Sequence, residues 1–368
     1  MHKNVKIGIF CLLTVSLICV LWIILSKMKC DDDEWQQFKQ NFIRTFESKE
    51  EENKRKVIFC ETLQTVAQHN LEFQNGKVTF KMGINKFADS TFEEFHELYA
   101  RDPVDEPDDV YEKMKQSVET VLISKSIDEI DNVPKNFDWR DRGAITEVKD
   151  QGSCGSCYAF GAIGVLESRW FIETGNLTEF SVQEIVDCTA SYQNYDCNGG
   201  RPGPSIAYVK DHGINFEADY PYEGKVGKCR KQKNKINFKL RGYGVAIAND
   251  KIFDDDKVLK STLVTQGPLA IFLNIDHESF MRYSSGIYFE PKCSSRTTHV
   301  TLLVGYGKTG QDQDYWIIKN SFGRQWGEGG YIRIARNRGN DCEARTFGTF
   351  AVTERIKVKN TSKKANKF

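Results

Sequence analysis

The stretch at residues 151–160 reads QGSCGSCYAF and decides the fold of this chain. A turn rich in glycine and serine carries two cysteines and leads into an apolar segment from Tyr158 to Thr174. This segment predicts a buried helix with Gly175 as its C-cap. Cys157 would then lie at the helix N-terminus, where unpaired backbone N–H groups and the helix dipole favour an anion. Such a position lowers the pKa of a thiol, and the thiolate is the nucleophilic form.

Three other functions are open to the C-x-x-C pair that Cys154 and Cys157 form. Half of a zinc site would require a second C-x-x-C or an H-x3-H motif, and the sequence contains neither, so we expect no metal. A thioredoxin-like redox pair would require a flanking βαβ unit, and the sequence around the pair shows no such pattern. In the third alternative both cysteines are in disulfides, which would leave no free nucleophile.

The composition limits the class of protein and its compartment. With 368 residues, 40% of them hydrophobic, the chain can bury a full core and has room for more than one domain. The 51 Lys and Arg residues balance 51 Asp and Glu residues, so no excess of positive charge favours nucleic acid as a partner. The 11 cysteines predict an oxidising compartment. Two Asn-x-Ser/Thr sequons, at Asn176 and Asn360, predict glycosylation there.

Residues 7–25 form an apolar run without charge, with lysines on both sides. The run is longer than the apolar region of a cleaved signal peptide, and no clear small-residue cleavage site follows it. Since about 20 apolar residues can span a bilayer, we expect a signal anchor within residues 1–30, with a cleaved signal peptide as the alternative. Either assignment sends the chain from Asp31 onward into the secretory pathway, for a lysosomal or extracellular location.

Residues 31–100 are polar and show helical spacing. Trp35, Phe38, Phe42 and Phe46 recur at intervals of three and four residues, as on one face of a helix. A second set follows with similar spacing at Glu51, Arg55, Phe59, Thr62, Val66 and Asn70. Taken alone, these patterns predict only amphipathic helices.

Residues 101–132 are rich in Asp and Glu and contain two prolines. Such a composition orders poorly and is open to proteolysis, so it predicts a linker. We expect proteolytic cleavage within this linker, before Pro134, with residues 133–368 as the domain that follows.

Several of these stretches resemble the papain-like cysteine peptidases. Residues 151–160 contain their C-G-[SA]-C-[WY] signature. The helical positions from Glu51 to Asn70 resemble the ERFNIN order of cathepsin L-type propeptides, with Thr62 and Val66 as departures, and a G-x-N-x-F-x-D motif follows at residues 83–89. The resemblance implies an α+β fold with a helical half and a β-barrel-like half, the active site between them, and an inhibitory propeptide at residues 31–100.

A cysteine nucleophile needs a base, and His299 is the histidine best placed to be one. It opens an apolar run and lies about 140 residues after Cys157, within the range of papain-like histidines. The resemblance makes His299 the base, Asn320 the group that orients its ring, and Gln151 a donor to the oxyanion. It implies hydrolysis of protein or peptide substrates through a thiolate–imidazolium pair and an acyl-enzyme, without a cofactor.

Two residues depart from the family pattern at this site. Tyr158 and Phe322 stand where the family has tryptophan. Phenylalanine can still shield the hydrogen bond between His299 and Asn320 from water, so the enzyme assignment stands. The alternative is a catalytically silent binding protein that keeps the scaffold.

The cysteine count bears on whether Cys157 is free. The part of the chain after the linker contains an odd number of cysteines, so one thiol is left over. Sequence alone does not decide the pairing, because six cysteines allow fifteen schemes. The resemblance implies free Cys157 and the pairs Cys154–Cys197, Cys188–Cys229 and Cys293–Cys342.

The resemblance also locates the pocket for the substrate side chain two residues before the scissile bond. Its lining follows a C-N-G-G turn and comprises Gly199, Gly200, Arg201 and Pro202. Phe347 would form the floor, where its ring would shorten the pocket, and Arg201 at the rim would favour acidic neighbours.

Overall fold

The computed structural model describes residues 30–100, 133–230, 235–247, 255–294, 296–338, 342, 344 and 347–353. The apolar run at residues 7–25, the linker at residues 101–132 and the sequon at Asn360 lie outside these ranges. Among the helices within them, none is both long enough and apolar enough to cross a membrane.

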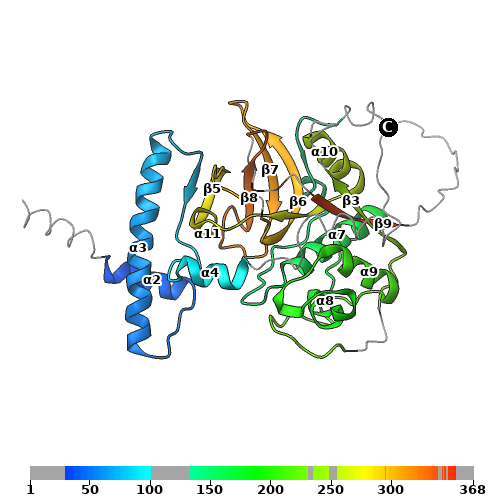
Figure 1. The fold of residues 1–368 in the computed structure, drawn as a ribbon, viewed down its shortest axis with the longest axis horizontal. Helices are drawn as coiled ribbons and strands as arrows, with labels where there is room; N and C mark the ends of the chain where they lie inside the picture. Colours follow the sequence, from blue (N-terminus) through cyan, green and yellow to red (C-terminus); the bar gives the residue numbers. More distant parts are fainter. Residues whose placement is uncertain are drawn as a thin grey trace, which may run out of the picture.

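Residues 30–100 form an N-terminal unit of three helices, α2 (Asp32–Asn41), α3 (Lys49–Gln74) and α4 (Phe92–Tyr99). Figure 1 shows α2 and α3 at one end of the molecule, with α4 next to the strands. The prediction of one helix face through Phe46 was wrong, because α2 ends at Asn41 and the chain turns at Ile43, whose φ is 50°. Phe46 returns to stack on Trp35 with 5.7 Å between ring centroids.

The residues of the second predicted pattern, from Glu51 to Asn70, lie on α3 and make two kinds of contact. Phe59 is buried against Trp35 and Phe38 of α2, with ring centroids 5.4 and 4.7 Å away. Arg55 donates to Glu51 one turn earlier and to Glu94 of α4, at 2.6 and 2.5 Å. The apolar contact therefore holds α2 to α3, and the charged contact holds α3 to α4.

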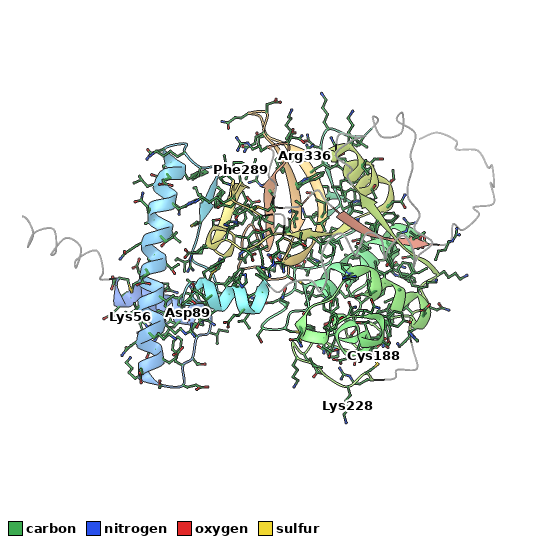
Figure 2. All side chains as sticks on the ribbon, viewed as in Figure 1. Lys56, Asp89, Cys188, Lys228, Phe289 and Arg336 are labelled. Atoms are coloured by element: carbon green, nitrogen blue, oxygen red, sulfur yellow. A yellow bond between two sulfur atoms is a disulfide. The ribbon has the colours of Figure 1, made fainter. Side chains whose placement is uncertain are left out.

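Another ion pair, between Arg44 and Asp89, closes the turn that follows α2. Figure 2 labels Asp89 among the helices of the N-terminal unit. Asp89 is the last residue of the predicted G-x-N-x-F-x-D motif, and it is buried. The motif therefore contributes a buried carboxylate to the packing of this unit.

The strands form one sheet in the order β1-β5-β8-β7-β6-β4-β9-β3, and β2 pairs with β6. Their bounds are Phe80–Met82 (β1), Phe137–Asp138 (β2), Leu240–Ile247 (β3), Leu269–Leu273 (β4), Tyr283–Tyr288 (β5), His299–Lys308 (β6), Asp314–Lys319 (β7), Tyr331–Ala335 (β8) and Phe347–Thr353 (β9). Strand β6 pairs antiparallel with β4 and β7 and is buried from His299 to Gly307. β1 of the N-terminal unit pairs antiparallel with β5 at the edge of this sheet.

The other helices are α7 (Cys157–Thr174), α8 (Val182–Cys188), α9 (Pro202–His212), α10 (Asp255–Gln266) and α11 (Glu278–Met281). Figure 1 shows α7, α8 and α9 together on the side of the molecule away from α3. The predicted buried helix is confirmed as α7, and Gly175 ends it in the left-handed conformation with φ 76°.

Two glycines let α7 lie directly on β6. A Cβ atom at Gly161 would be 2.7 Å from Val300 Cγ1, and one at Gly164 would be 2.8 Å from Leu302 Cδ2. Both distances are shorter than any carbon–carbon packing distance, so the close approach requires glycine. Val300 and Leu302 face the cluster around α7, whereas Leu303 and Tyr306 of the same strand face a second core on the β-rich side.

Four disulfides lie in the described residues. Three of them are the pairs that the resemblance implies, Cys154–Cys197, Cys188–Cys229 and Cys293–Cys342. The fourth, Cys30–Cys60, joins the start of the N-terminal unit to α3 and was not predicted. Among the described cysteines, Cys157 is the one with a free thiol, which removes the alternative that both members of the C-x-x-C pair are in disulfides.

The packing of α7 on β6 can be tested with Gly161→Ala. In an open helix this substitution stabilises by up to about 1 kcal/mol, but overpacking against the stiff Val300 side chain should instead lower the free energy of unfolding by about 1–3 kcal/mol. Urea unfolding measures the change. The double variant Gly161→Ala/Val300→Ala should recover most of the loss, and a single variant as stable as the wild type would contradict the contact.

Candidate active site

Cys157 is the first residue of α7, and its side chain is only partly exposed. Burial raises the pKa of its thiol to about 11, although the nearby backbone N–H groups of Val300, Tyr158 and Cys157 act to lower that pKa. The lowered thiol pKa expected from the helix N-terminus is therefore not found in this form of the protein. Removal of the sulfur from water outweighs the nearby dipoles.

His299 begins β6, immediately before Val300, and is almost completely buried. Asn320 follows β7, and its Oδ1 accepts a hydrogen bond from the backbone N–H of Ser321 at 2.8 Å. That bond identifies Oδ1 as the amide oxygen, so the contact of 2.9 Å to His299 Nε2 requires Nε2–H to donate. The neutral ring then carries its lone pair on Nδ1.

His299 Nδ1 is buried and has no hydrogen-bond partner among the described residues. Cys157 begins α7, whose Gly161 lies against Val300, the residue after His299, so this unpaired acceptor is on the strand that α7 packs against. Burial lowers the pKa of His299 to about 4, and its hydrogen bond with Asn320 opposes that shift. Cysteine and histidine are therefore both uncharged here across the neutral pH range.

Phe322 and Tyr158, the two residues that differ from the tryptophan of the family pattern, each have a structural role. Phe322 is fully buried and covers His299, with 5.0 Å between ring centroids. The Tyr158 hydroxyl donates to the backbone oxygen of Asp196 at 3.0 Å. Tyr158 thereby connects the start of α7 to the loop that leads to the glycine turn.

Gln151 is fully buried, and its amide is held from both ends. Ser321 Oγ donates to Oε1 at 2.6 Å, and Nε2 donates to the Cys154 carbonyl at 3.0 Å. Tyr222 adds a hydrogen bond from its hydroxyl to the Gln151 carbonyl at 2.8 Å. An amide nitrogen carries two hydrogens, and the described hydrogen bonds of Gln151 Nε2 use one of them.

Sequence reasoning missed the residues that position Gln151 and the glycine turn. Ser321 and Tyr222 fix Gln151, and nothing in the local sequence around Tyr222 signals this contact. Asn194 is buried and accepts from the Arg201 N–H at 2.7 Å, while a Cβ at Gly200 would lie 2.5 Å from Asn194 Oδ1. The glycine turn is therefore shaped by the buried amide of Asn194, five residues before Gly199 in the chain.

The predicted pocket residues lie together where this turn meets α9. Gly199, Gly200 and Pro202 are buried, and Arg201 is the N-cap residue of α9 and is partly exposed. Phe347 begins β9, but its side chain lies outside the described part of the structure. The predicted lining after the turn is thus one continuous segment, and the predicted floor is not described.

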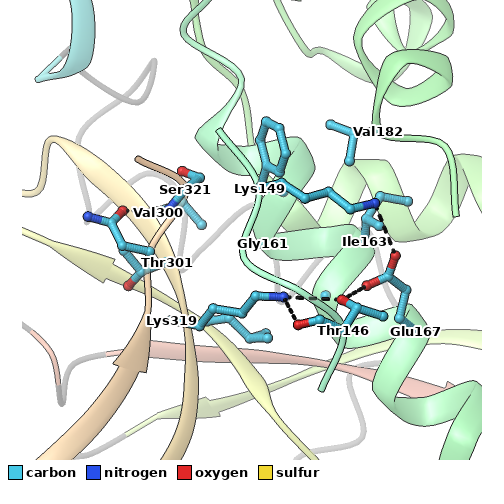
Figure 3. Close-up of a pocket in the computed structure, with 14 residues that line it drawn as sticks. Thr146, Lys149, Gly161, Ile163, Glu167, Val182, Val300, Thr301, Lys319 and Ser321 are labelled. Atoms are coloured by element: carbon cyan, nitrogen blue, oxygen red, sulfur yellow. Dashed lines mark hydrogen bonds and ion pairs between the residues drawn. The ribbon is translucent and has the colours of Figure 1, made fainter. Parts of the chain in front are cut away.

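A buried cluster of charged side chains lies beneath the site, between α7 and the sheet (Figure 3). Lys319 of β7 donates to Thr146 Oγ1 at 3.1 Å, and this hydroxyl donates to Glu167 of α7 at 2.6 Å. Burial lowers the pKa of Lys319 to about 8 and raises that of Glu167. Lys319 immediately precedes Asn320, so the cluster anchors the Asn320 loop to α7.

The N-terminal unit covers one end of this site. Phe87, Phe95 and Tyr99 surround Phe322, with ring centroids 5.5, 5.9 and 4.9 Å away. Arg282, at the end of α11, donates to the Phe87 carbonyl at 3.3 Å. The described residues contain no group of three or more His, Cys, Asp or Glu side chains that could hold a metal ion.

Comparison with known families identifies this architecture. Residues 133–352 match the family described as papain family cysteine protease, and residues 35–95 match the cathepsin propeptide inhibitor domain (I29). The chain belongs to the papain family of cysteine proteases. Its N-terminal unit is the inhibitory prodomain, so the structure is that of a proform.

Known relatives agree with this assignment over most of the chain. A cathepsin L-like peptidase of Aedes aegypti is 38% identical over 324 residues, covering 86% of this chain and 92% of the relative. Procathepsin L of Mus musculus is 38% identical over 87% of this chain and 91% of the relative. The solved structure of digestive procathepsin L 3 from Tenebrio molitor larval midgut has a TM-score of 0.77 and 33% identity, covering 87% of this chain and 98% of that one. The predicted papain-like α+β fold is confirmed.

The neutral state of His299 predicts how the stability of the protease proform depends on pH. Because burial holds the folded pKa near 4 and the unfolded value is 6.5, the unfolded chain binds more protons between these limits. Stability should therefore fall as pH drops from 7 toward 4. For the variant Cys157→Ser, which lacks the thiol, the histidine should account for a loss of about 2–3 kcal/mol between pH 7 and pH 4.5.

Urea unfolding at both pH values measures this loss. The double variant Cys157→Ser/His299→Gln is the control, since other titrating groups cancel in the difference between the two proteins. A difference that does not change with pH would show that His299 is not held neutral.

Proposed function

We propose that Cys157, His299, Asn320 and Gln151 form the catalytic centre of this protease and hydrolyse peptide bonds through an acyl-enzyme. The observation that carries the proposal is the unpaired, buried Nδ1 of His299, on the strand against which the helix that begins with Cys157 packs. An acceptor without a partner is costly in a protein interior, and it is what a thiol needs in order to lose its proton.

The first step is proton transfer from Cys157 to His299 Nδ1. Asn320 keeps the ring in place through Nε2–H, and as a neutral amide it suits an imidazolium that the thiolate already balances. In the proform, burial favours the uncharged pair. Entry of water and substrate after prodomain removal reduces that penalty, so the ion pair belongs to the mature protease.

The thiolate then attacks the substrate carbonyl carbon. The oxyanion accepts the second N–H of Gln151 Nε2 and the backbone N–H of Cys157. His299 gives its proton to the leaving amine, and a water molecule hydrolyses the acyl-enzyme with His299 again as base.

The prodomain accounts for synthesis as an inactive precursor. Its strand β1 extends the sheet, and its rings cover Phe322, which lies over His299. We place the domain boundaries at residues 31–100 for the prodomain and 133–368 for the peptidase, with cleavage in the acidic linker between them.

The substrate pocket comprises Gly199, Gly200, Arg201 and Pro202, with Phe347 as its floor. The turn held by Asn194 supports the first four of these positions. The disulfides support an oxidising compartment of the secretory pathway, lysosomal or extracellular. We also propose glycosylation at Asn176, which is exposed, and at Asn360. Residues 7–25 would anchor the protein to the membrane.

A thiol-directed epoxide probe tests the nucleophile. After an added protease cleaves the linker, the probe should label Cys157, and Cys157→Ser should abolish both labelling and hydrolysis. Mass spectrometry of the labelled peptide locates the site. Labelling absent from the activated wild type would favour the alternative of a silent binding protein, which no observation on the described residues supports.

The oxyanion donor is tested by Gln151→Ala, which should lower kcat by about 10²–10³-fold with a smaller change in KM. Gln325→Ala is the matched control, because Gln325 is exposed and its described contact is with the prodomain. Equal kcat values for the two variants would remove Gln151 from the catalytic centre.

A further inference from the structure

An ion pair joins the prodomain to the loop that carries the proposed oxyanion donor. Lys86 Nζ lies 2.6 and 2.7 Å from the two carboxylate oxygens of Asp150, the residue before Gln151. Lys86 belongs to the prodomain motif at residues 83–89, whereas Asp150 belongs to the peptidase. The prodomain therefore inserts a cation beside the catalytic loop.

Aromatic rings complete the surroundings of this ammonium group. Lys86 Nζ is 5.0 Å from the Phe87 ring centroid, 5.7 Å from that of Tyr99 and 6.0 Å from that of Phe322. A cation within about 6 Å of a ring face is attracted by the ring electrons. Phe87 and Tyr99 leave with the prodomain, but Phe322 stays with the peptidase.

The Asp150 carboxylate is held in place by the peptidase itself. Gly152 N–H donates to Oδ1 at 2.9 Å, and a Cβ at Gly323 would be 2.9 Å from Oδ2, so the carboxylate lies closely against the backbone of both loops. The two adjacent cations are engaged elsewhere. Lys149 lies among the carboxylates of Glu167, Glu179 and Glu217, and Arg324 pairs with Glu147.

The contacts of the loop from Asp150 to Cys157 indicate at which end of the active-site cleft Asp150 lies. Asp150 forms a backbone bridge with Phe322 on the β-rich side. At the other end of the loop, Cys154 is joined by a disulfide to Cys197, directly before the glycine turn. We place the substrate residues that precede the scissile bond at that turn. Asp150 lies at the opposite end of the loop, and therefore on the side of the substrate residues that follow the scissile bond.

We propose that Asp150 and Phe322 form a subsite for a lysine or arginine side chain among the first three substrate residues after the scissile bond. Lys86 occupies this subsite in the proform and leaves with the prodomain. The subsite then presents a fixed carboxylate and one ring face without the cation that paired with them. This inference rests on the proposed function, because it assumes cleavage at Cys157.

The test uses protease activated from the full-length proform, and quenched fluorescent peptides that share one sequence before the scissile bond. Lysine or norleucine, which has a similar length but no charge, stands at the first, second or third position after that bond. At one of these positions, lysine should raise kcat/KM about 3–10-fold at low salt, as expected for an exposed ion pair with a ring contact. The ratio should decrease in about 0.5 M salt, because ions screen the pair.

Three variants make the assignment specific. Asp150→Asn should bring the lysine-to-norleucine ratio close to one, and Asp150→Glu should restore part of the preference. Asp312→Asn is the matched control, since it makes the same change at an exposed carboxylate in the turn between β6 and β7 whose partner is Lys308, and it should keep the wild-type ratio.

Two results would overturn the subsite. One is a ratio near one at all three positions in the wild type, and the other is a preference that persists in Asp150→Asn. Failure of the activated wild type to cleave any peptide or to react with the epoxide would instead overturn the proposed function, and the subsite with it.

Discussion

Helix α7 lies directly on strand β6, and the positions of Cys157, His299 and Asn320 depend on that contact. Gly161 and Gly164 present no side chain to Val300 and Leu302, so the helix and the strand approach more closely than any larger residue would allow. Cys157 begins the helix and His299 begins the strand, and the contact therefore determines how a thiol and an imidazole meet. The buried chain from Lys319 through Thr146 to Glu167 then holds the Asn320 loop to the same helix.

The prodomain makes three kinds of contact with the peptidase. It pairs a strand with β5, packs rings on Phe322 and places Lys86 on Asp150. Burial in this form raises the pKa of Cys157 and lowers that of His299, which keeps both groups neutral. Under the proposed mechanism, inhibition combines steric cover with an electrostatic penalty on the ion pair.

Particular residues show where sequence reasoning succeeded and where it failed. The helix from Cys157 to Thr174 and the strand from His299 were predictable because apolar runs and a C-cap glycine are local signals. Phe46 was misplaced because the turn at Ile43 depends on Arg44, which reaches the Lys86 carbonyl and Asp89 far along the chain. The disulfide between Cys30 and Cys60 was missed for a similar reason, since the start of α2 must first fold back onto α3.

The sequence by itself determined the family of the protein: a cysteine at a helix N-terminus, a histidine opening a buried strand, a prodomain motif and an odd number of cysteines after the linker. These are patterns and counts of residue type, and they need no knowledge of how distant parts of the chain pack. The tertiary structure alone decided the protonation states, the tautomer of His299 and the pairing of Lys86 with Asp150. Burial and hydrogen-bond partners set these properties, and both come from residues that meet only when the two halves and the prodomain have packed together.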